Sequence, residues 1–126
     1  MKRLEGPNVK KGKNKRDLAE QVMEDIRLFK QQNSLDRLVM VWCGSTEVYM
    51  KESEAHQSMR NFERALEEND PSIPSSMVYA YAAIRGGIPY ANAAPNLTAD
   101  IPALVELAAH TKAPLAGKDL KTGQTL

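Results

Sequence analysis

The hydrophobic positions of this chain alternate between helical and strand-like spacing, which predicts an α/β fold. From residue 15 to residue 32 the apolar side chains recur at helical intervals and share one side of an α-helix: Leu18, Val22, Ile26 and Phe29. Residues 38–42 then form a continuous apolar run. Such a run is typical of a strand buried on both faces, as in a parallel sheet covered by helices.

The rest of the chain continues this alternation. Met59, Phe62 and Leu66 have helical spacing, and Gly86 with Gly87 provides a C-cap signal after a stretch rich in alanine and tyrosine. We expect helices at residues 53–68, 77–85 and 101–111, and strands at residues 88–91 and 114–116. The order of elements predicts a partial Rossmann-like parallel sheet with flanking helices, incomplete without further segments on either side.

Composition narrows the classes of function. Acidic and basic residues nearly cancel, at 16 and 17, so the overall charge favours neither nucleic acid nor a membrane surface. Basic residues gather within residues 1–16, but no aromatic residue is interleaved there for base stacking, which favours a solvated connector over a nucleic-acid-binding arm. The N-terminus is charged, and no apolar run is long enough to span a bilayer. We therefore expect a soluble, cytoplasmic protein without nucleic-acid or membrane partners.

The cysteine and histidine content gives no sign of a metal site. Cys43 is the only cysteine, which excludes an internal disulfide and a cysteine cluster. Cys43 and Trp42 are expected to be buried at the end of a strand. His56 and His110 lie on different predicted helices without metal-ligand spacing, and both are expected at the surface.

Each predicted strand ends in a polar loop of small residues, at residues 43–47, 92–96 and 117–125. If the strands are parallel, these loops share the edge of the sheet where open α/β folds bind ligands. The last loop combines lysines with glycines that free backbone N–H groups, which suits an anionic small molecule. Sequence spacing alone leaves open a second interpretation, in which these are ordinary polar loops and a solvated chain end.

Three segments resemble, in order and spacing, the signature blocks of the myo-inositol-1-phosphate synthase family: residues 41–49, 87–96 and 117–125. The resemblance implies an NAD-dependent isomerase that cyclises glucose 6-phosphate to inositol phosphate for inositol and phospholipid biosynthesis. In that reaction NAD oxidises C5, the C6 enolate attacks the C1 aldehyde, and the ketone is reduced again. The family also implies a homotetramer as the full-length enzyme.

The resemblance assigns roles to individual residues. It implies cofactor contacts for residues in all three loops: Gly44, Ser45, Thr46, Glu47, Asn92, Ala94 and Asp119. It implies substrate contacts for Asn96, Lys121 and Gln124. Lys121 is the expected catalytic residue, because an ammonium group can stabilise the substrate phosphate or a developing oxyanion. No metal ligand is implied.

The chain departs from the family pattern at several positions. Ala93 replaces a usual glycine, Lys118 stands where an aspartate is common, and Leu126 replaces a frequent lysine. If the position of Ala93 needs a positive φ, the loop would be strained. More seriously, no G-x-G-x-x-G motif occurs anywhere in the chain to hold a pyrophosphate.

These observations predict a fragment of the synthase that is inactive alone. We expect residues 1–14 to form a basic loop or disordered entry, residues 15–116 the second part of a dinucleotide-binding α/β domain, and residues 117–126 the start of the catalytic loop. An alternative stays open: a non-catalytic α/β module that binds a phosphorylated metabolite or a protein partner. The absent glycine-rich turn is what that alternative also predicts.

Overall fold

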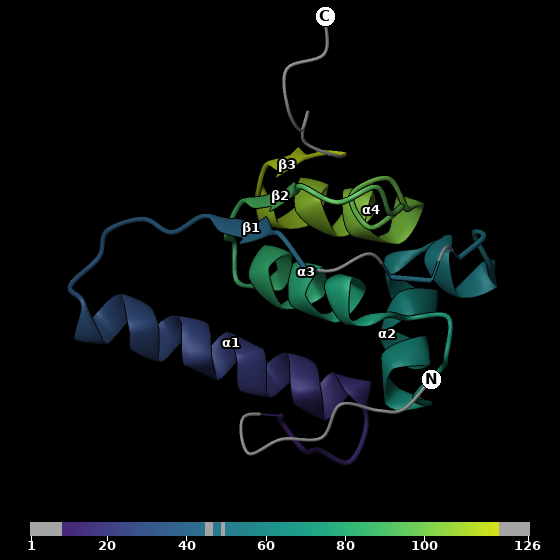
Figure 1. Cartoon of the computed structure of the whole chain (residues 1–126), viewed down its shortest axis with the longest axis horizontal. Helices are drawn as coiled ribbons and strands as arrows, with labels where there is room; N and C mark the ends of the chain where they lie inside the picture. Colours follow the sequence, from purple (N-terminus) through teal and green to yellow (C-terminus); the bar gives the residue numbers. More distant parts are fainter. Residues whose placement is uncertain (1–8, 45–46, 49, 119–126) are drawn as a thin grey trace, which may run out of the picture.

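The computed structural model describes residues 9–44, 47–48 and 50–118 (Figure 1). Its elements, in chain order, are α1 (Lys15–Gln32), β1 (Met40–Trp42), the 3-10 helix η1 (Glu54–His56), α2 (Met59–Glu67), α3 (Ser75–Arg85), β2 (Tyr90–Asn92), α4 (Pro102–Thr111) and β3 (Leu115–Ala116). This is the α/β order that the hydrophobic pattern predicts.

The three strands form one parallel sheet in the order β1-β2-β3. Met40 pairs with Tyr90 and Trp42 with Asn92, while Tyr90 pairs with Leu115 on its other side. The predicted parallel α/β fold is confirmed, although each strand begins one or two residues later than its apolar run. Because β2 is central, Tyr90 and Asn92 are both buried.

Helix α1 has the predicted bounds because its start carries a strong cap. The side-chain oxygen of Asn14 accepts a hydrogen bond from the backbone nitrogen of Asp17 at 2.8 Å. Asp17 also places a negative charge in the first turn, where it interacts favourably with the helix dipole. Ala19 and Val22 are the buried residues of the helix.

The single helix predicted over residues 53–68 is wrong, because the segment divides into η1 and α2. Ser58 lies between the two parts with extended backbone angles, and its side chain accepts a hydrogen bond from the backbone nitrogen of Asn61 at 3.1 Å. A serine that caps a new helix competes with continuing the old one. The polar composition of the segment hid this break.

Helix α3 is the centre of the molecule, and it lies between α1 and the sheet while also contacting α4 (Figure 1). Its buried face is built largely from small residues that allow close approach: Ala80, Ala82 and Ala83. The predicted glycine terminator is present, since Gly87 has φ of 76° and the nitrogen of Ile88 donates to the carbonyl of Ala83 at 2.8 Å.

The prediction that β1 is buried on both faces is wrong. Val39 is 65% exposed and Val41 is 53% exposed, whereas Met40 and Trp42 pack against the core. Strand β1 lies at the edge of the three-stranded sheet. Within the part of the chain that the structure describes, helices therefore cover only one side of this strand.

Two other burial predictions are also wrong. His56 is buried, because both ring nitrogens have backbone partners: the Ser53 nitrogen donates to Nδ1 at 3.1 Å, and Nε2 lies 2.8 Å from the carbonyl oxygen of Ser72. Cys43 is exposed. His110 lies at the surface as predicted.

Candidate functional site

Parallel pairing brings the three polar loops to one edge of the sheet. Cys43 follows β1, Ala93 follows β2, and Gly117 follows β3. The nitrogen of Ala93 donates to the carbonyl oxygen of Trp42 at 3.0 Å, so the first two loops begin side by side. The shared edge predicted from the loop positions is therefore present in the described part of the chain, and we call it the loop edge.

The start of the first loop lies against the last residue of its own strand. A Cβ atom at Gly44 would lie 2.5 Å from Cζ2 of Trp42, so only glycine lets the backbone approach the indole this closely. The indole in turn packs against Tyr79 of α3, with ring centroids 5.5 Å apart. Gly44 is thus held at the loop edge through contact with a core aromatic residue.

Glu47 joins the first loop to the start of α3. Its Oε1 accepts a hydrogen bond from the backbone nitrogen of Ser76 at 2.9 Å, and its Oε2 accepts one from Ser76 Oγ at 2.8 Å. Ser76 Oγ also lies 2.7 Å from Oγ1 of Thr98, and both hydroxyl residues are buried. The predicted cofactor residue Glu47 therefore has a structural contact that its sequence position did not reveal.

The second loop is organised by two asparagine side chains. Asn92 Nδ2 donates to Oδ1 of Asn96 at 2.7 Å, and Asn92 Oδ1 accepts from the nitrogen of Ala94 at 3.1 Å. Oδ1 of Asn96 also accepts from the nitrogen of Thr98 at 3.1 Å. The buried Nδ2 of Asn96 has no partner among the described residues. Hydrogen bonds from two side chains therefore define the shape of this loop, and the Nδ2 group of Asn96 keeps its N–H donors unused among the described residues.

The substitution of glycine by Ala93 does not strain the second loop. Among the described residues, positive φ at non-glycine positions occurs at Ser34, Asn69 and Lys112, and Ala93 is not one of these. Its backbone instead continues the pairing with β1 through the bond to Trp42. Alanine therefore meets the conformational requirement at this position.

The third loop starts tightly packed against the second. A Cβ atom at Gly117 would lie 3.0 Å from Cβ of Ala99 and 3.1 Å from Cβ of Asn92, which favours glycine here. The next residue, Lys118, forms an ion pair with Asp100 at 3.5 Å between Nζ and Oδ2. Both side chains are about half exposed, so the pair contributes little to stability.

The predicted site residues divide into two groups. Gly44, Glu47, Asn92, Ala94 and Asn96 come together along the loop edge, as described above. The other predicted site residues lie outside the described residues: Ser45, Thr46, Asp119, Lys121 and Gln124. The sequence did not predict that Ser76 and Thr98 connect the loops. The one signal that could have indicated it was the presence of these two hydroxyl residues within or beside otherwise apolar helices.

Burial changes the pKa of one tyrosine beneath the loop edge. Tyr90 is buried at the centre of the sheet, and this desolvation, with a smaller contribution from the negative charge of Glu47, raises the pKa of its phenol. Its hydroxyl lies 3.4 Å from the carbonyl oxygen of Ser76. Tyr90 therefore stays neutral, and its phenol acts as a donor to the backbone of α3.

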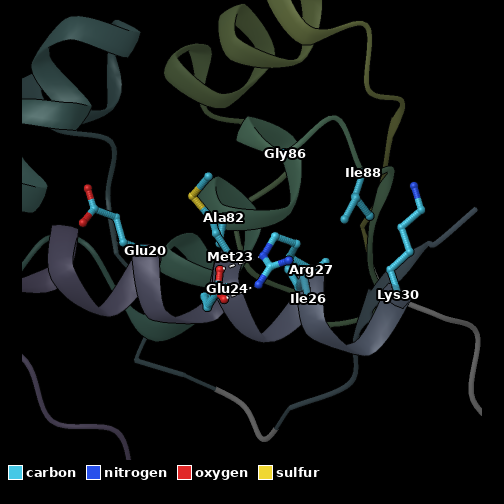
Figure 2. A pocket seen from close by; sticks show the side chains of 9 residues that line it. All are labelled: Glu20, Met23, Glu24, Ile26, Arg27, Lys30, Ala82, Gly86 and Ile88. Carbon is cyan, nitrogen blue, oxygen red and sulfur yellow. Dashed lines mark hydrogen bonds and ion pairs between the residues drawn. The ribbon is translucent and has the colours of Figure 1, made fainter. Parts of the chain in front are cut away.

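Hollows of the described surface also lie away from the loop edge. Figure 2 shows a groove between α1 and the end of α3, where Met23 and Ile26 face Ala82 and Ile88. Four charged residues of α1 line it, Glu20, Glu24, Arg27 and Lys30, and Arg27 is paired with Glu24 at 2.6 Å. The groove includes no residue of the three loops, and it has no set of polar groups directed at a common point. It is not the candidate site.

Neither a metal cluster nor a membrane-spanning helix is present within residues 9–44, 47–48 and 50–118. No three histidine, cysteine, aspartate or glutamate side chains in this part of the chain come together to hold a metal ion. No helix in the same part is both long enough and apolar enough to cross a membrane.

The three-stranded parallel sheet with its helices places this chain in the open α/β class. Comparison with known proteins identifies the family. The family model for myo-inositol-1-phosphate synthase, a model of an NAD-binding domain, matches residues 2–123. The chain belongs to this family, and NAD is the cofactor that the family model implies.

Individual relatives agree with this assignment. Inositol-3-phosphate synthase 1 of Bacteroides thetaiotaomicron is 43% identical over 126 residues, which cover 99% of this chain and 29% of the relative. The Saccharomyces cerevisiae inositol-3-phosphate synthase is 36% identical over 84% of this chain and 20% of its own length. The crystal structure of the Caenorhabditis elegans enzyme superposes with a TM-score of 0.87 at 32% identity, covering 94% of this chain and 23% of that one. The chain thus spans less than a third of these relatives.

Proposed function

We propose that this chain is part of an inositol-3-phosphate synthase, an NAD-dependent isomerase that converts glucose 6-phosphate to myo-inositol phosphate. One observation carries the proposal: three loops, each part of a segment that resembles a signature block of the family, begin together at the loop edge of a parallel sheet. Ligands of open α/β folds bind at this edge. Residues 15–116 would then be the second part of the NAD domain, and residues 117–126 the start of the catalytic loop.

The described residues suit one part of a bound NAD molecule. Small side chains at Gly44 and Ala94 allow backbone groups to approach a flat cofactor. The chain has no glycine-rich pyrophosphate turn, so it would supply part of the cofactor site. When bound, NAD would take a hydride from C5 of the sugar and return it later, with no net oxidation.

The residues of this chain would position the reactants and stabilise charge. Ser45, Thr46, Asn92 and Asp119 would contact the cofactor together with Gly44, and Glu47 belongs to the same loop. Asn96 and Gln124 would contact the sugar phosphate. Enolisation and ring closure develop negative charge on oxygen, and the ammonium group of Lys121 would stabilise that charge in a site that excludes water.

The wider biology of the enzyme is also a proposal. Family membership supports a homotetrameric, cytoplasmic isomerase in inositol and phospholipid biosynthesis, with a sugar phosphate as its small-molecule partner. The near-neutral charge of the chain gives no reason to add nucleic acid or a membrane to its partners.

A hybrid enzyme tests the proposed function. The matching segment of the Bacteroides thetaiotaomicron synthase, which is 43% identical, would be replaced by these 126 residues. We expect the hybrid to convert glucose 6-phosphate to inositol phosphate in the presence of NAD. A hybrid that has a cooperative thermal transition and binds NAD, but forms no inositol phosphate, would contradict the proposal and favour a non-catalytic binding module.

A further inference from the structure

Glu47 supplies the N-terminus of α3 with an acceptor that the helix lacks locally. The N-cap residue of α3 is Pro74, whose side chain makes no capping hydrogen bond. First-turn N–H groups need acceptors from outside the helix. Glu47 provides one from 29 residues away, through its bonds of 2.9 and 2.8 Å to Ser76. Its negative charge also suits a helix N-terminus.

The charge of Glu47 fixes the direction of the buried hydroxyl contacts. An ionised carboxylate can only accept, so the hydroxyl proton of Ser76 points to Glu47 Oε2. The hydroxyl of Thr98, 2.7 Å away, must then donate to Ser76 Oγ. Both Ser76 and Thr98 are fully buried, so water cannot readily replace either bond.

The same contacts continue into the second loop. The nitrogen of Thr98 donates to Oδ1 of Asn96, which also accepts from Asn92 Nδ2. A continuous series of contacts therefore runs from Glu47 through Ser76 and Thr98 to the two asparagines. It joins two loops that are neighbours at the loop edge but are far apart in sequence.

We propose that Glu47 is a positioning residue that holds the end of the first loop against the loop of residues 92–96. Glu47 acts through Ser76 and Thr98 and sets the spacing of the two loops without contacting the cofactor itself. This inference rests on the proposed function, because the spacing matters for NAD. The contacts themselves do not depend on it.

Replacing Glu47 by glutamine removes the charge but keeps the hydrogen bonds, so it distinguishes a positioning role from a role that needs the negative charge. In Glu47→Gln, Oε1 can still accept from the Ser76 nitrogen, while Nε2 can donate to Ser76 Oγ and the Ser76 hydroxyl can turn to Thr98. The series of contacts survives with the hydroxyl directions reversed. In Glu47→Leu no acceptor remains, and in Ser76→Ala the hydroxyl is lost while the carboxylate stays.

Amide hydrogen exchange of the 126-residue chain, followed by NMR, tests the contacts directly. We expect Glu47→Leu to speed amide exchange at Ser76 and at Thr98 at least tenfold. Ser76→Ala should speed exchange at Thr98 as well. Glu47→Gln should change the exchange rates of Ser76 and Thr98 less than threefold. Glu52→Leu, at an exposed glutamate five residues along, is the matched control and should change neither. Unchanged exchange at Ser76 in Glu47→Leu would overturn the proposal. If Glu47→Leu does not fold, Ser76→Ala gives the same decision at Thr98.

Steady-state kinetics of the hybrid enzyme test the consequence for NAD. We expect Glu47→Leu and Ser76→Ala each to raise KM for NAD about tenfold with a smaller effect on kcat, and Glu47→Gln to restore KM to within threefold. Equal losses in Glu47→Gln and Glu47→Leu would show that the charge itself is needed, and would overturn positioning in favour of direct contact. If the unmodified hybrid forms no product, the proposed function fails, and the exchange measurements still decide whether Glu47 holds the loops.

Discussion

Gly44 lies so close to the indole of Trp42 that a Cβ atom there would be 2.5 Å from Cζ2. We expect Gly44→Ala to force the indole or the loop to move, at a cost of about 1–3 kcal/mol in the free energy of unfolding. Because Trp42 is the only tryptophan, its fluorescence should change along with Tm. The control is Gly86→Ala, where the new Cβ would meet only ordinary contacts at 3.5 Å. Equal behaviour of the two variants would contradict this packing.

The exposure of Val41 changes the expectation for its substitution. A strand buried on both faces predicts that Val41→Asp prevents folding, but the side chain is 53% exposed. We now expect Val41→Asp to change the free energy of unfolding by no more than about 0.5 kcal/mol. Leu66→Asp should instead unfold the chain, because it buries an unpaired charge in the core. Urea denaturation compares the two, and an unfolded Val41→Asp protein would show that the outer face of β1 is covered.

Acid should weaken the turn before α3. Ser72 donates to Oδ1 of Asp70 from its backbone nitrogen at 2.8 Å and from its hydroxyl at 2.7 Å, and these bonds lower the pKa of Asp70 below its ordinary value of 3.8. A depressed pKa gives stability that is present above that ordinary value and is lost as pH falls through the native value. Thermal melts between about pH 6 and pH 2.5 should therefore show a smaller acid loss for Asp70→Asn. An unchanged pH dependence would contradict this role.

The isolated chain should bind NAD poorly. Without a glycine-rich turn it offers no pyrophosphate site, so only a part of the cofactor would be held. We expect isothermal titration to give no affinity near the micromolar range, which corresponds to about −8 kcal/mol. For the same reason the chain alone should not turn over glucose 6-phosphate. Micromolar binding would mean that the loop edge forms a complete site.

Lys121 is the residue on which the proposed chemistry depends most. In the hybrid enzyme, Lys121→Ala should lower kcat by roughly a hundredfold or more, since a well-placed electrostatic donor contributes about 3–4 kcal/mol to transition-state stabilisation. NAD affinity should stay within a few-fold, because the ammonium group is proposed to face the substrate. Lys112→Ala, at an αL helix end, is the control and should retain activity. Near-normal activity of Lys121→Ala would remove the only proposed catalytic residue.

The elements were predictable where local signals agree. The helix at residues 15–32 has a clean apolar stripe and an asparagine cap, and the prediction matches its bounds. The helix of residues 75–85 was found from its C-terminal end, because Gly86 and Gly87 mark where it stops. The break at Ser58 was not found, because a serine within a polar stretch looks the same inside a helix as at its cap.

The burial of individual side chains and their long-range contacts could not be predicted from the sequence. Val41 sits in a continuous apolar run, yet its exposure depends on which strand lies at the edge of the sheet. His56 is buried because Ser53 and Ser72 offer backbone partners to both ring nitrogens. The three loops were placed at one edge by topology alone, but the bond between Glu47 and Ser76 requires tertiary structure to be seen.

The central place of α3 determines how this segment moves. Because α1, α4 and two strands all pack on this one helix, none of these layers can separate without exposing the alanine-rich face that the others share. We therefore expect the segment to unfold as a single cooperative unit, with the slowest amide exchange in α3. In any domain motion of a longer enzyme, we would then expect α3 and the sheet that packs on it to move together.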